Sequence, residues 1–521
     1  MANFEAQKLA KSAQKDEIWP ILSPFPLWFY KKISTFAPSF YTYWIMEQLI
    51  GRKREVAELM RCYHSDRSEF AILYGRRRIG KTFLVNQTFR SRFAFQFTGS
   101  HQSSKERQLE MFAQALQQYG GVGYYPAPDS WHHAFDALRN MLQHKRTKGK
   151  MVVFFDEMPW IDTYGSEFVA ALEDFWNAWA AQRDDIFFIA CGSATSWMVD
   201  KLVENQGGLH GRITARIYLR PFDLDETEQY LRAHGCVWSR YTITQCYMYL
   251  GGVPYYLSLL DCQHELSANI DDLFFSTSAR LAGEFQELFN VLFKDAESYV
   301  EIVRLLASRR EGLTRQELAK ATNSGGGSLT RRIENLERCD FIRGQQQIGN
   351  KKKGIIYRLS DFYTLFYLRF VEGVRRRDRP YWPLMIESRE VSVWQGLTFE
   401  MVAMVHVEQI IRQLGIAGVL TNVCSWRSTV GNSGSQIDLL IERSDNYIYL
   451  CEAKFASEPF VVSKDYEEHL RNRMTIFREE TKTRKALLTT FITTYGVKPG
   501  IHSAVVQREV LLEHLFLPAS V

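Results

Sequence analysis

Length and composition indicate a globular protein of several domains. The chain has 521 residues, of which 46% are hydrophobic and 24% are charged, and 64 Lys and Arg stand against 59 Asp and Glu, for a net charge of +5. These values exclude disordered, collagen-like and membrane-spanning classes of protein. At roughly 100 to 200 residues per domain, three or four domains are expected. Because the net charge is small, any nucleic-acid surface must be a local basic patch.

The first 46 residues are predicted to be an extension of unknown role. Its aromatic-rich part, residues 18–45, is interrupted by four prolines before its end and by Lys31 and Lys32. Neither a membrane span nor a signal peptide is therefore expected, and no membrane partner. Met46 stands directly before a clean domain start, so we hypothesise that the native chain begins there.

The cysteines are dispersed, without a Cys-x-x-Cys pair or a zinc-like spacing. They are Cys62, Cys191, Cys236, Cys246, Cys262, Cys339, Cys424 and Cys451. This pattern predicts isolated thiols in a reducing compartment, and a cytoplasmic location is expected.

Residues 47–222 alternate apolar strands with helical segments. The expected strands are residues 70–74, 151–155, 186–190 and 216–219. Strands that alternate with helices predict an α/β fold with a parallel sheet covered on both faces. Residues 223–292 contain no comparable strand and are predicted to form a helical lid.

A phosphate-binding loop pattern stands between the first strand and the next helix. It consists of Gly75, Arg76, Arg77, Arg78, Ile79, Gly80, Lys81 and Thr82, and is followed by Phe83 in the predicted nucleotide site. Glycines let backbone N–H groups surround a phosphate, and the helix N-terminus adds its positive dipole. Lys81 is expected to neutralise the β- and γ-phosphates of ATP, and Thr82 to bind Mg²⁺. The alternative is a glycine turn that merely carries Lys-Thr.

An acidic pair follows the strand at residues 151–155. Asp156 and Glu157 are delivered to the carboxyl end of this strand, where ligands of open α/β sheets bind. Asp156 is expected to hold Mg²⁺ through water, and Glu157 to polarise the attacking water. Such a pair is also common in plain turns, and the upstream loop makes the functional interpretation the stronger one.

Further short motifs accompany the loop and the acidic pair. They are Ile50-Gly51-Arg52, Cys191-Gly192-Ser193, Gly211-Arg212 and Gly251-Gly252-Val253-Pro254. Over residues 47–292 the set resembles the archaeal-type AAA+ ATPase family, which is related to the signal-transducing STAND ATPases.

The resemblance implies roles for several residues. Ile50 and Gly51 line the adenine pocket, and Pro254 caps the nucleotide from the lid. Ser193 senses the γ-phosphate, with Thr195 and Ser196 as alternatives. Arg212 acts in trans or as a sensor, and Arg216 is an alternative because either arginine could offset charge in the transition state. An arginine that acts in trans requires self-association through the AAA+ core, which is therefore expected. The alternative is that both residues are ordinary surface arginines.

Residues 293–372 show a winged helix-turn-helix pattern. Helices at 300–307, from Thr314 and after 324–327 precede a β-like pair at 341–343 and 354–358. In the third helix Arg331, Arg332 and Arg338 could enter a DNA groove, and Lys351 to Lys353 could contact phosphates. Winged helices also bind proteins, and the basic run from Arg375 to Arg379 reads as a linker or a phosphate contact.

Residues 373–521 read as a second α/β unit. Its expected elements are a helix at 399–414, hairpin strands at 436–441 and 447–452, a helix at 464–477 and a strand at 485–491. Antiparallel pairing of the hairpin brings Asp438, Glu452 and Lys454 to one end, and period-two alternation puts Glu452 and Lys454 on one face. Two carboxylates can bind Mg²⁺, and a lysine beside them can position water and stabilise phosphate charge. This combination suits nuclease chemistry.

The arrangement resembles the PD-(D/E)xK restriction-endonuclease-like superfamily, in the form of the C-terminal domain that accompanies DEXX-box members of the archaeal-type ATPases. Glu400 on the preceding helix matches the helical acidic residue of the superfamily, whereas Ile437 replaces the proline before Asp438. Two alternatives are a hairpin with solvated charges and a nuclease fold that only binds.

The sequence therefore predicts a Mg²⁺-dependent ATPase that couples nucleotide state to DNA binding or cleavage by its C-terminal domain. The alternative is a STAND-like regulatory switch or interaction protein whose C-terminal domain does not cleave.

Overall fold

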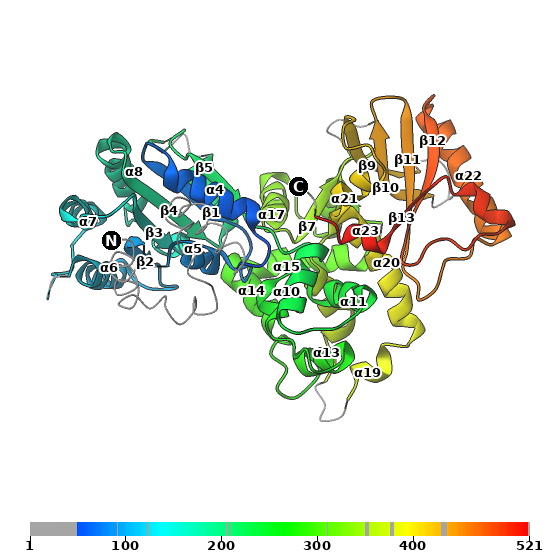
Figure 1. Ribbon diagram of the computed structural model, residues 1–521, viewed down its shortest axis with the longest axis horizontal. Coiled ribbons are helices and arrows are strands. Elements are labelled where there is room, and N and C mark those ends of the chain that lie inside the picture. Colours follow the sequence, from blue (N-terminus) through cyan, green and yellow to red (C-terminus); the bar gives the residue numbers. More distant parts are fainter. Residues whose placement is uncertain are drawn as a thin grey trace, which may run out of the picture.

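The computed structural model describes residues 49–518, apart from residues 91, 122, 124, 205–206, 210, 310, 350–353, 376–379 and 429–434. Figure 1 shows a sheet with its helices at one end, a second sheet at the other end, and a mainly helical region between them. The predictions for residues 1–46, for Lys351 to Lys353 and for residues 376–379 lie outside the described residues. Within the described part, no helix is long and apolar enough to cross a membrane.

A five-stranded parallel sheet forms the N-terminal unit, in the order β2-β3-β4-β1-β5. Its strands are β1 (Glu69–Tyr74), β2 (Phe93–Thr98), β3 (Met151–Asp156), β4 (Ile186–Gly192) and β5 (Ala215–Tyr218). The predicted parallel sheet is confirmed. Strand β2 was not among the predicted strands, and it lies at an edge of the sheet.

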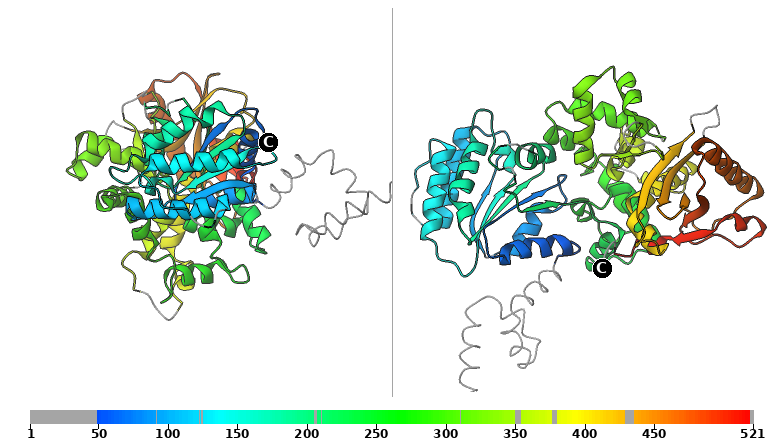
Figure 2. Two further views of the ribbon diagram at one scale, coloured as in Figure 1. Left: turned by 90° about the vertical axis from the view of Figure 1, so that its left-hand side faces the viewer. Right: turned by 90° about the horizontal axis from the view of Figure 1, so that it is seen from above.

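Helices cover both faces of this sheet, as Figure 2 shows. One face packs against α4 (Lys53–His64) and α5 (Lys81–Phe89), and the other against α6 (Lys105–Gly120), α7 (Trp131–His144) and α8 (Phe168–Ala178). Successive residues of β1 alternate between the two cores, with Phe70 and Ile72 in one and Ala71 and Leu73 in the other. A strand buried on both faces explains the continuous apolar run in the sequence. Short elements complete the unit: η1 (Met158–Trp160), η2 (Ala180–Gln182), α9 (Thr195–Met198) and the π-helix η3 (Val199–Val203).

Residues 223–292 are helical, as expected. The helices are α10 (Leu224–Ala233), α11 (Arg240–Leu250), α12 (Pro254–Leu257), α13 (Leu266–Phe274) and α14 (Glu284–Leu292). Asp223 begins α10 with a capping box, since its side chain accepts from the Glu226 N–H and the Glu226 side chain accepts from the Asp223 N–H.

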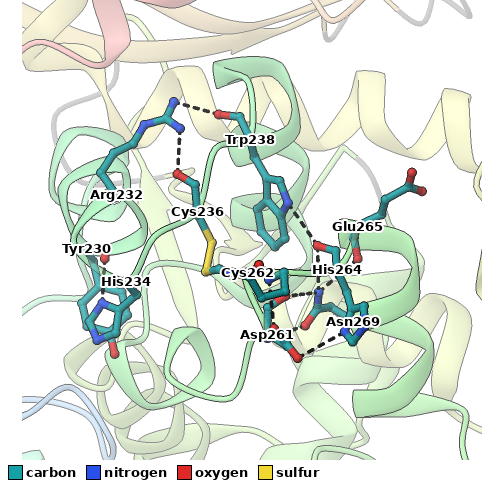
Figure 3. The surroundings of a disulfide bond; sticks show 11 residues. Tyr230, Arg232, His234, Cys236, Trp238, Asp261, Cys262, His264, Glu265 and Asn269 are labelled. Carbon is teal, nitrogen blue, oxygen red and sulfur yellow. Dashed lines mark hydrogen bonds and ion pairs between the residues drawn. A yellow bond between two sulfur atoms is a disulfide. The ribbon is translucent and has the colours of Figure 1, made fainter.

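A disulfide joins two loops of this helical region (Figure 3), which corrects the prediction of isolated thiols. Cys236 follows α10 and Cys262 precedes α13, with a Cα–Cα distance of 4.7 Å. The other cysteines are buried thiols. A pairing between dispersed cysteines is set by the fold and cannot be read from their spacing. The cysteines as a set therefore do not support a reducing compartment.

Three helices and a small antiparallel sheet follow. They are α15 (Ala296–Ser308), β6 (Leu313–Thr314), α16 (Arg315–Ala321), α17 (Gly326–Arg338), β7 (Ile342–Gln345) and β8 (Ile356–Leu359), with the strand order β6-β8-β7. The chain continues through α18 (Phe362–Phe366), the π-helix η4 (Tyr367–Val371) and α19 (Trp382–Met385). These helices share one hydrophobic core with the preceding helical region.

The C-terminal unit is a mixed five-stranded sheet in the order β13-β12-β11-β10-β9. Its elements are α20 (Arg389–Val405), α21 (Val407–Gln413), β9 (Thr421–Arg427), β10 (Gln436–Arg443), β11 (Tyr447–Lys454), α22 (Lys464–Thr481), β12 (Ala486–Thr493), η5 (Ile501–Val505), β13 (Arg508–Leu511) and α23 (Leu512–Leu515). Strands β9, β10 and β11 are antiparallel, and β12 and β13 continue in parallel to β11. The predicted hairpin is present, whereas β9 and β13 were not predicted, and the expected helix at 399–414 is divided between α20 and α21.

Candidate functional site: a phosphate loop and a C-terminal acidic cavity

The phosphate loop has the backbone that its glycines predict. Gly75 has φ of 144°, and a Cβ there would lie 2.3 Å from the carbonyl oxygen of Leu219, so a larger residue is excluded. Gly80 has φ of 85° directly before α5, whose first residue is Lys81. The loop therefore leads into a helix N-terminus, which suits a phosphate.

Lys81 lies buried at the base of this loop. Its ammonium group donates to the carbonyl oxygens of Gly75 (3.0 Å) and Arg76 (2.8 Å), and burial lowers its pKa. A bound phosphate would take the place of these carbonyl oxygens as the partner of the Lys81 ammonium group. Phe83, two residues further on, is 56% exposed.

The two predicted halves of the nucleotide site meet at the end of β3. The Thr82 hydroxyl donates to Asp156 Oδ2 at 2.7 Å, and the Ser193 hydroxyl donates to Glu157 Oε2 at 2.9 Å. Glu157 has φ of 46° in a left-handed turn. Thr82 and Asp156 suit Mg²⁺, because this ion takes one or two protein oxygens and completes its shell with phosphates and water.

The predicted adenine segment contacts both the loop and the helical region. A Cβ on Gly51, which has φ of 65°, would lie 2.4 Å from Glu226 Oε1. The Arg52 backbone N–H donates to the same oxygen at 3.1 Å, and the Arg52 guanidinium donates to the Ile79 carbonyl oxygen at 3.3 Å. Ile50 is half-buried beside them. Helix α10 is thereby tied to the start of the N-terminal unit.

Pro254 begins α12 next to the phosphate loop. The N–H of Tyr255 donates to the Arg78 carbonyl oxygen at 3.4 Å, and the Arg78 guanidinium lies 4.2 Å from the centre of the Tyr255 ring. The structure thus brings the loop, the acidic pair, the adenine segment and the Pro254 segment together.

Two of the three loop arginines form ion pairs with residues elsewhere in the chain. Arg76 is 1% exposed and forms an ion pair with Asp361, and Arg78 pairs with Glu284 at 2.9 Å. Arg77 is half-buried. The loop is therefore tied to α14 and to the segment after β8.

Arg212 and Arg216 lie on the surface. Both are exposed, at and just before β5. Thr195, an alternative to Ser193 as a sensor, is buried, and Ser196 is half-buried.

The C-terminal residues predicted from sequence line one cavity of about 340 Å³. Glu400 comes from α20, Asp438 from β10, and Glu452 and Lys454 from β11. Strands β10 and β11 are antiparallel and pair Leu439 with Cys451, so the next pair of opposite residues is Asp438 and Glu452. Three further polar side chains from α22 line the same cavity: Tyr466, His469 and Arg473.

Glu452 is held by basic and phenolic groups. Lys454 Nζ lies 2.8 Å from its Oε1, Tyr466 donates to the same oxygen, and Arg473 pairs with Oε2. Burial opposes ionisation, but Arg473 and Lys454 outweigh it and lower the pKa of Glu452 to about 2. The carboxylate is therefore charged throughout the physiological pH range.

Asp438 is held both from the small sheet and from its own strand. Arg358 on β8 donates to its Oδ1 at 2.6 Å, Gln345 on β7 donates to its carbonyl oxygen at 2.9 Å, and Gln436 donates to Oδ1 at 3.2 Å. Among the residues that the structure describes, no three His, Cys, Asp or Glu side chains lie close enough together to hold a metal ion. As arranged, these carboxylates do not fit a protein-held metal site.

Several contacts of the two sites had no signal in the sequence. They involve Glu226, Glu284, Arg358, Asp361, Tyr466 and Arg473. Each is a single charged or polar residue that lies 14 or more positions from its partner. Only the helical position of Tyr466 and Arg473, seven apart and on one face, could have suggested that they act together.

The fold and the phosphate loop define a P-loop ATPase unit, and comparison with known families agrees. Residues 49–260 match the model described as an ATPase domain predominantly from Archaea, which supports ATP binding and hydrolysis. Residues 298–365 match the model described as the B-block binding subunit of TFIIIC.

Relatives of known sequence or structure are distant. The chain is 20% identical over 411 residues to the uncharacterized protein MJECL04 of Methanocaldococcus jannaschii, covering 78% of this chain and 87% of the relative. The Walker-type ATPase PABY2304 of Pyrococcus abyssi is 18% identical with a TM-score of 0.47, covering 62% of this chain and 97% of that one. The ORC2 protein of Aeropyrum pernix, in ADPNP–ADP complexes, is 15% identical with a TM-score of 0.38, covering 61% and 93%.

Proposed function

We propose that the N-terminal half is a Mg²⁺-dependent AAA+ ATPase whose nucleotide state controls a DNA-directed, nuclease-like C-terminal domain. In the ATPase site Lys81 binds the β- and γ-phosphates of ATP, and Thr82 and Asp156 hold Mg²⁺, which would offset phosphate charge. Glu157 accepts a proton from the attacking water, and Ser193, bonded to Glu157, senses the γ-phosphate. Ile50, Gly51 and Pro254 enclose the base.

The proposed organisation follows the sequence boundaries. Residues 47–222 form the ATPase core, 223–292 the lid, 293–372 a winged helix-turn-helix and 373–521 the nuclease-like domain. The match of residues 298–365 to a B-block binding subunit supports DNA as the partner of this region. Arg212, with Arg216 as the alternative, is proposed to reach a neighbouring subunit, and its exposure supports this role. A cytoplasmic location is also proposed; the match to an ATPase domain supports it, whereas the cysteines do not.

One observation carries the nuclease proposal. Four residues selected from sequence, Glu400, Asp438, Glu452 and Lys454, line a single cavity. The cavity is built from a helix, a hairpin and a second helix, which are α20, β10–β11 and α22 in chain order. This is the order that the PD-(D/E)xK resemblance implies. In this proposal Lys454 stabilises the charge that develops on the cleaved phosphate.

A regulatory switch without cleavage is the second candidate, and the ion pairs favour it. Both Asp438 and Glu452 are neutralised by arginines, as in a site kept for structure or binding. In this case ATP is bound and hydrolysed slowly, and the C-terminal domain docks DNA or a protein.

The deciding experiment is cleavage of plasmid and linear DNA with Mg²⁺ or Mn²⁺, with and without ATP. Wild type is compared with Asp438→Ala and with Asp445→Ala, whose carboxylate is exposed at the far turn of the same hairpin. Cleavage that is lost only in Asp438→Ala, while ATP hydrolysis persists, supports the nuclease. No cleavage by a wild-type protein that binds ATP supports the switch.

A further inference from the structure

One short segment touches both sites. Arg358 in β8 pairs with Asp438 in the C-terminal cavity, at 2.6 Å, and Asp361, three positions later, pairs with Arg76 of the phosphate loop. The partners are only 11% and 17% exposed in the first pair, and 1% and 3% exposed in the second. Since both pairs are shielded from water, neither is a weak surface contact.

The β7–β8 hairpin is docked on the edge of the C-terminal sheet. Gln347 forms a parallel bridge with Ser425 of β9, and the backbone N–H of Ile348 donates to the Ser425 carbonyl oxygen at 2.9 Å. The N–H of Ser425 donates in turn to Gln346 at 2.9 Å, and Ile348 packs on the apolar cluster beneath α22. The hairpin thus joins the edge of the sheet through a single β-bridge.

This docking explains why Asp438 is not available to a metal ion. The Arg358 guanidinium binds Asp438 Oδ1, the atom that a cation would approach, and Gln345 fixes the backbone of the same residue. The groups on Glu452 belong to the same domain, since Lys454 lies on β11 and Arg473 on α22. Of the described charged groups paired in the cavity, only Arg358 comes from outside the C-terminal domain, on the small sheet, which shares one hydrophobic core with the C-terminal sheet. Its contact with Asp438 is therefore the one that a movement of the small sheet would change.

We infer that Arg358 is a removable plug of the C-terminal acidic cavity, which keeps a divalent cation out while the hairpin is docked. This inference rests on the proposed function, because it names the regulation of the same site. Withdrawal of the hairpin frees Asp438 to join Glu452 as a cation ligand.

The position of Asp361 links the plug to ATP. Its carboxylate caps α18, where it accepts from the Thr364 N–H at 3.1 Å, and it also holds Arg76. Arg76 is the residue after Gly75 in the loop that closes on phosphate, and its carbonyl oxygen accepts from Lys81. When Lys81 turns from this carbonyl to a phosphate, the loop backbone at Arg76 shifts and the shift reaches Asp361 and the end of β8.

Mn²⁺ binding to the full chain without nucleotide tests the plug, measured by calorimetry or by electron paramagnetic resonance. The variants are Arg358→Ala, Arg358→Ala with Asp438→Ala, and Arg343→Ala as the matched control, because Arg343 is the cross-strand neighbour of Arg358. Arg358→Ala is expected to bind one Mn²⁺ at least about tenfold more tightly than wild type, since a charge-assisted bond is removed. The gain is expected to vanish in the double variant and to be absent in Arg343→Ala.

Unchanged Mn²⁺ affinity in Arg358→Ala, or a gain that persists without Asp438, overturns the inference. If Arg358→Ala does not fold, Gln345→Ala is the second variant, because it removes another contact between the small sheet and Asp438. It is expected to raise the Mn²⁺ affinity roughly threefold. A gain in Mn²⁺ affinity without DNA cleavage leaves the plug standing and rejects the nuclease. Cleavage by wild type with unchanged affinity in both variants rejects the plug alone.

Hydrogen exchange tests the link to ATP. A non-hydrolysable ATP analogue is expected to speed exchange of the β8 amides at least threefold in wild type. Asp361→Asn keeps a good helix cap but loses the charge that holds Arg76, and is expected to abolish this response. An equal response in wild type and Asp361→Asn, or none in wild type, overturns the link.

Discussion

His406, between α20 and α21, offers a quantitative test of the contact between the helical region of residues 223–292 and the C-terminal unit. The side chain is fully buried, its Nε2 accepts from the Leu224 backbone N–H at 3.0 Å, and its Nδ1 lies 2.7 Å from the Val402 carbonyl oxygen. Nδ1 is therefore the protonated nitrogen of a neutral ring. Burial lowers the pKa of His406 to about 4. The perturbation is His406→Gln, in which an amide oxygen can still accept from Leu224 but cannot titrate.

The sign follows from the lowered pKa of a base. The unfolded chain, with a histidine pKa near 6.5, takes up the proton first, so stability is present above pH 6.5 and is lost as the pH falls towards 4. At pH 5, relative to pH 7.5, the loss from this one group is about 2 kcal/mol. Burial raises the pKa of Asp223, at the start of α10, to about 6 and acts in the opposite direction. This contribution is common to wild type and variant and cancels in the comparison.

The assay is denaturant unfolding at pH 7.5 and 5.0, followed by tryptophan fluorescence. Wild type is expected to lose about 2 kcal/mol more than His406→Gln between the two pH values. The control is His144→Gln, an exposed histidine at the end of α7, which should behave as wild type. An equal pH dependence in wild type and His406→Gln refutes the reasoning, because the ring would then titrate alike in the folded and unfolded states.

Four further predictions concern other parts of the chain. Gly252→Ala should cost about 3 kcal/mol or more, measured by thermal unfolding, because its Cβ would lie 1.9 Å from the Phe222 carbonyl oxygen. Glu157→Gln should slow ATP hydrolysis roughly 100-fold while nucleotide binding persists, and an unchanged rate would show that another residue activates the water. Cys262→Ser should cost about 3 kcal/mol in oxidising buffer and nothing under reduction, since the disulfide closes a separation of 26 residues. Asp200→Asn combined with Glu204→Gln should raise DNA affinity severalfold in a low-salt titration, because together they release Arg338 from both of its carboxylate partners, and equal affinities would exclude Arg338 from DNA contact.

Local patterns predicted the central part of the ATPase unit well. Strands buried on both faces have continuous apolar sequences, and the glycine loop and the acidic pair follow two of them directly. The missed strands, β2, β9 and β13, lie at or near sheet edges, where burial imposes a weaker pattern. Strand β9 is also paired with the segment after β7, through the bridge between Gln347 and Ser425, and no local pattern encodes such a contact.

The same division holds for the sites. Lys81, Thr82 and Asp156 could be selected because phosphate chemistry requires these residue types next to defined elements. Their supporting partners could not, because an ion pair such as Arg76 with Asp361 joins residues 285 positions apart. All three loop arginines were counted in the predicted nucleotide site, whereas two of them, Arg76 and Arg78, form ion pairs with residues elsewhere in the chain.

The basic side chains of α17 lead to a related conclusion about DNA. Arg338 pairs with Asp200 at 2.7 Å and with Glu204 at 3.0 Å, both on the ATPase unit, and Arg331 lies 3.6 Å from Asp200. On its other side the small sheet holds β9 and Asp438. Arg338 is thus engaged with the ATPase unit, and the small sheet with the C-terminal sheet. DNA binding that uses Arg338 therefore has to break its ion pairs with the ATPase unit, and a nucleotide that shifts this contact would control access to DNA and to the acidic cavity through the same movement.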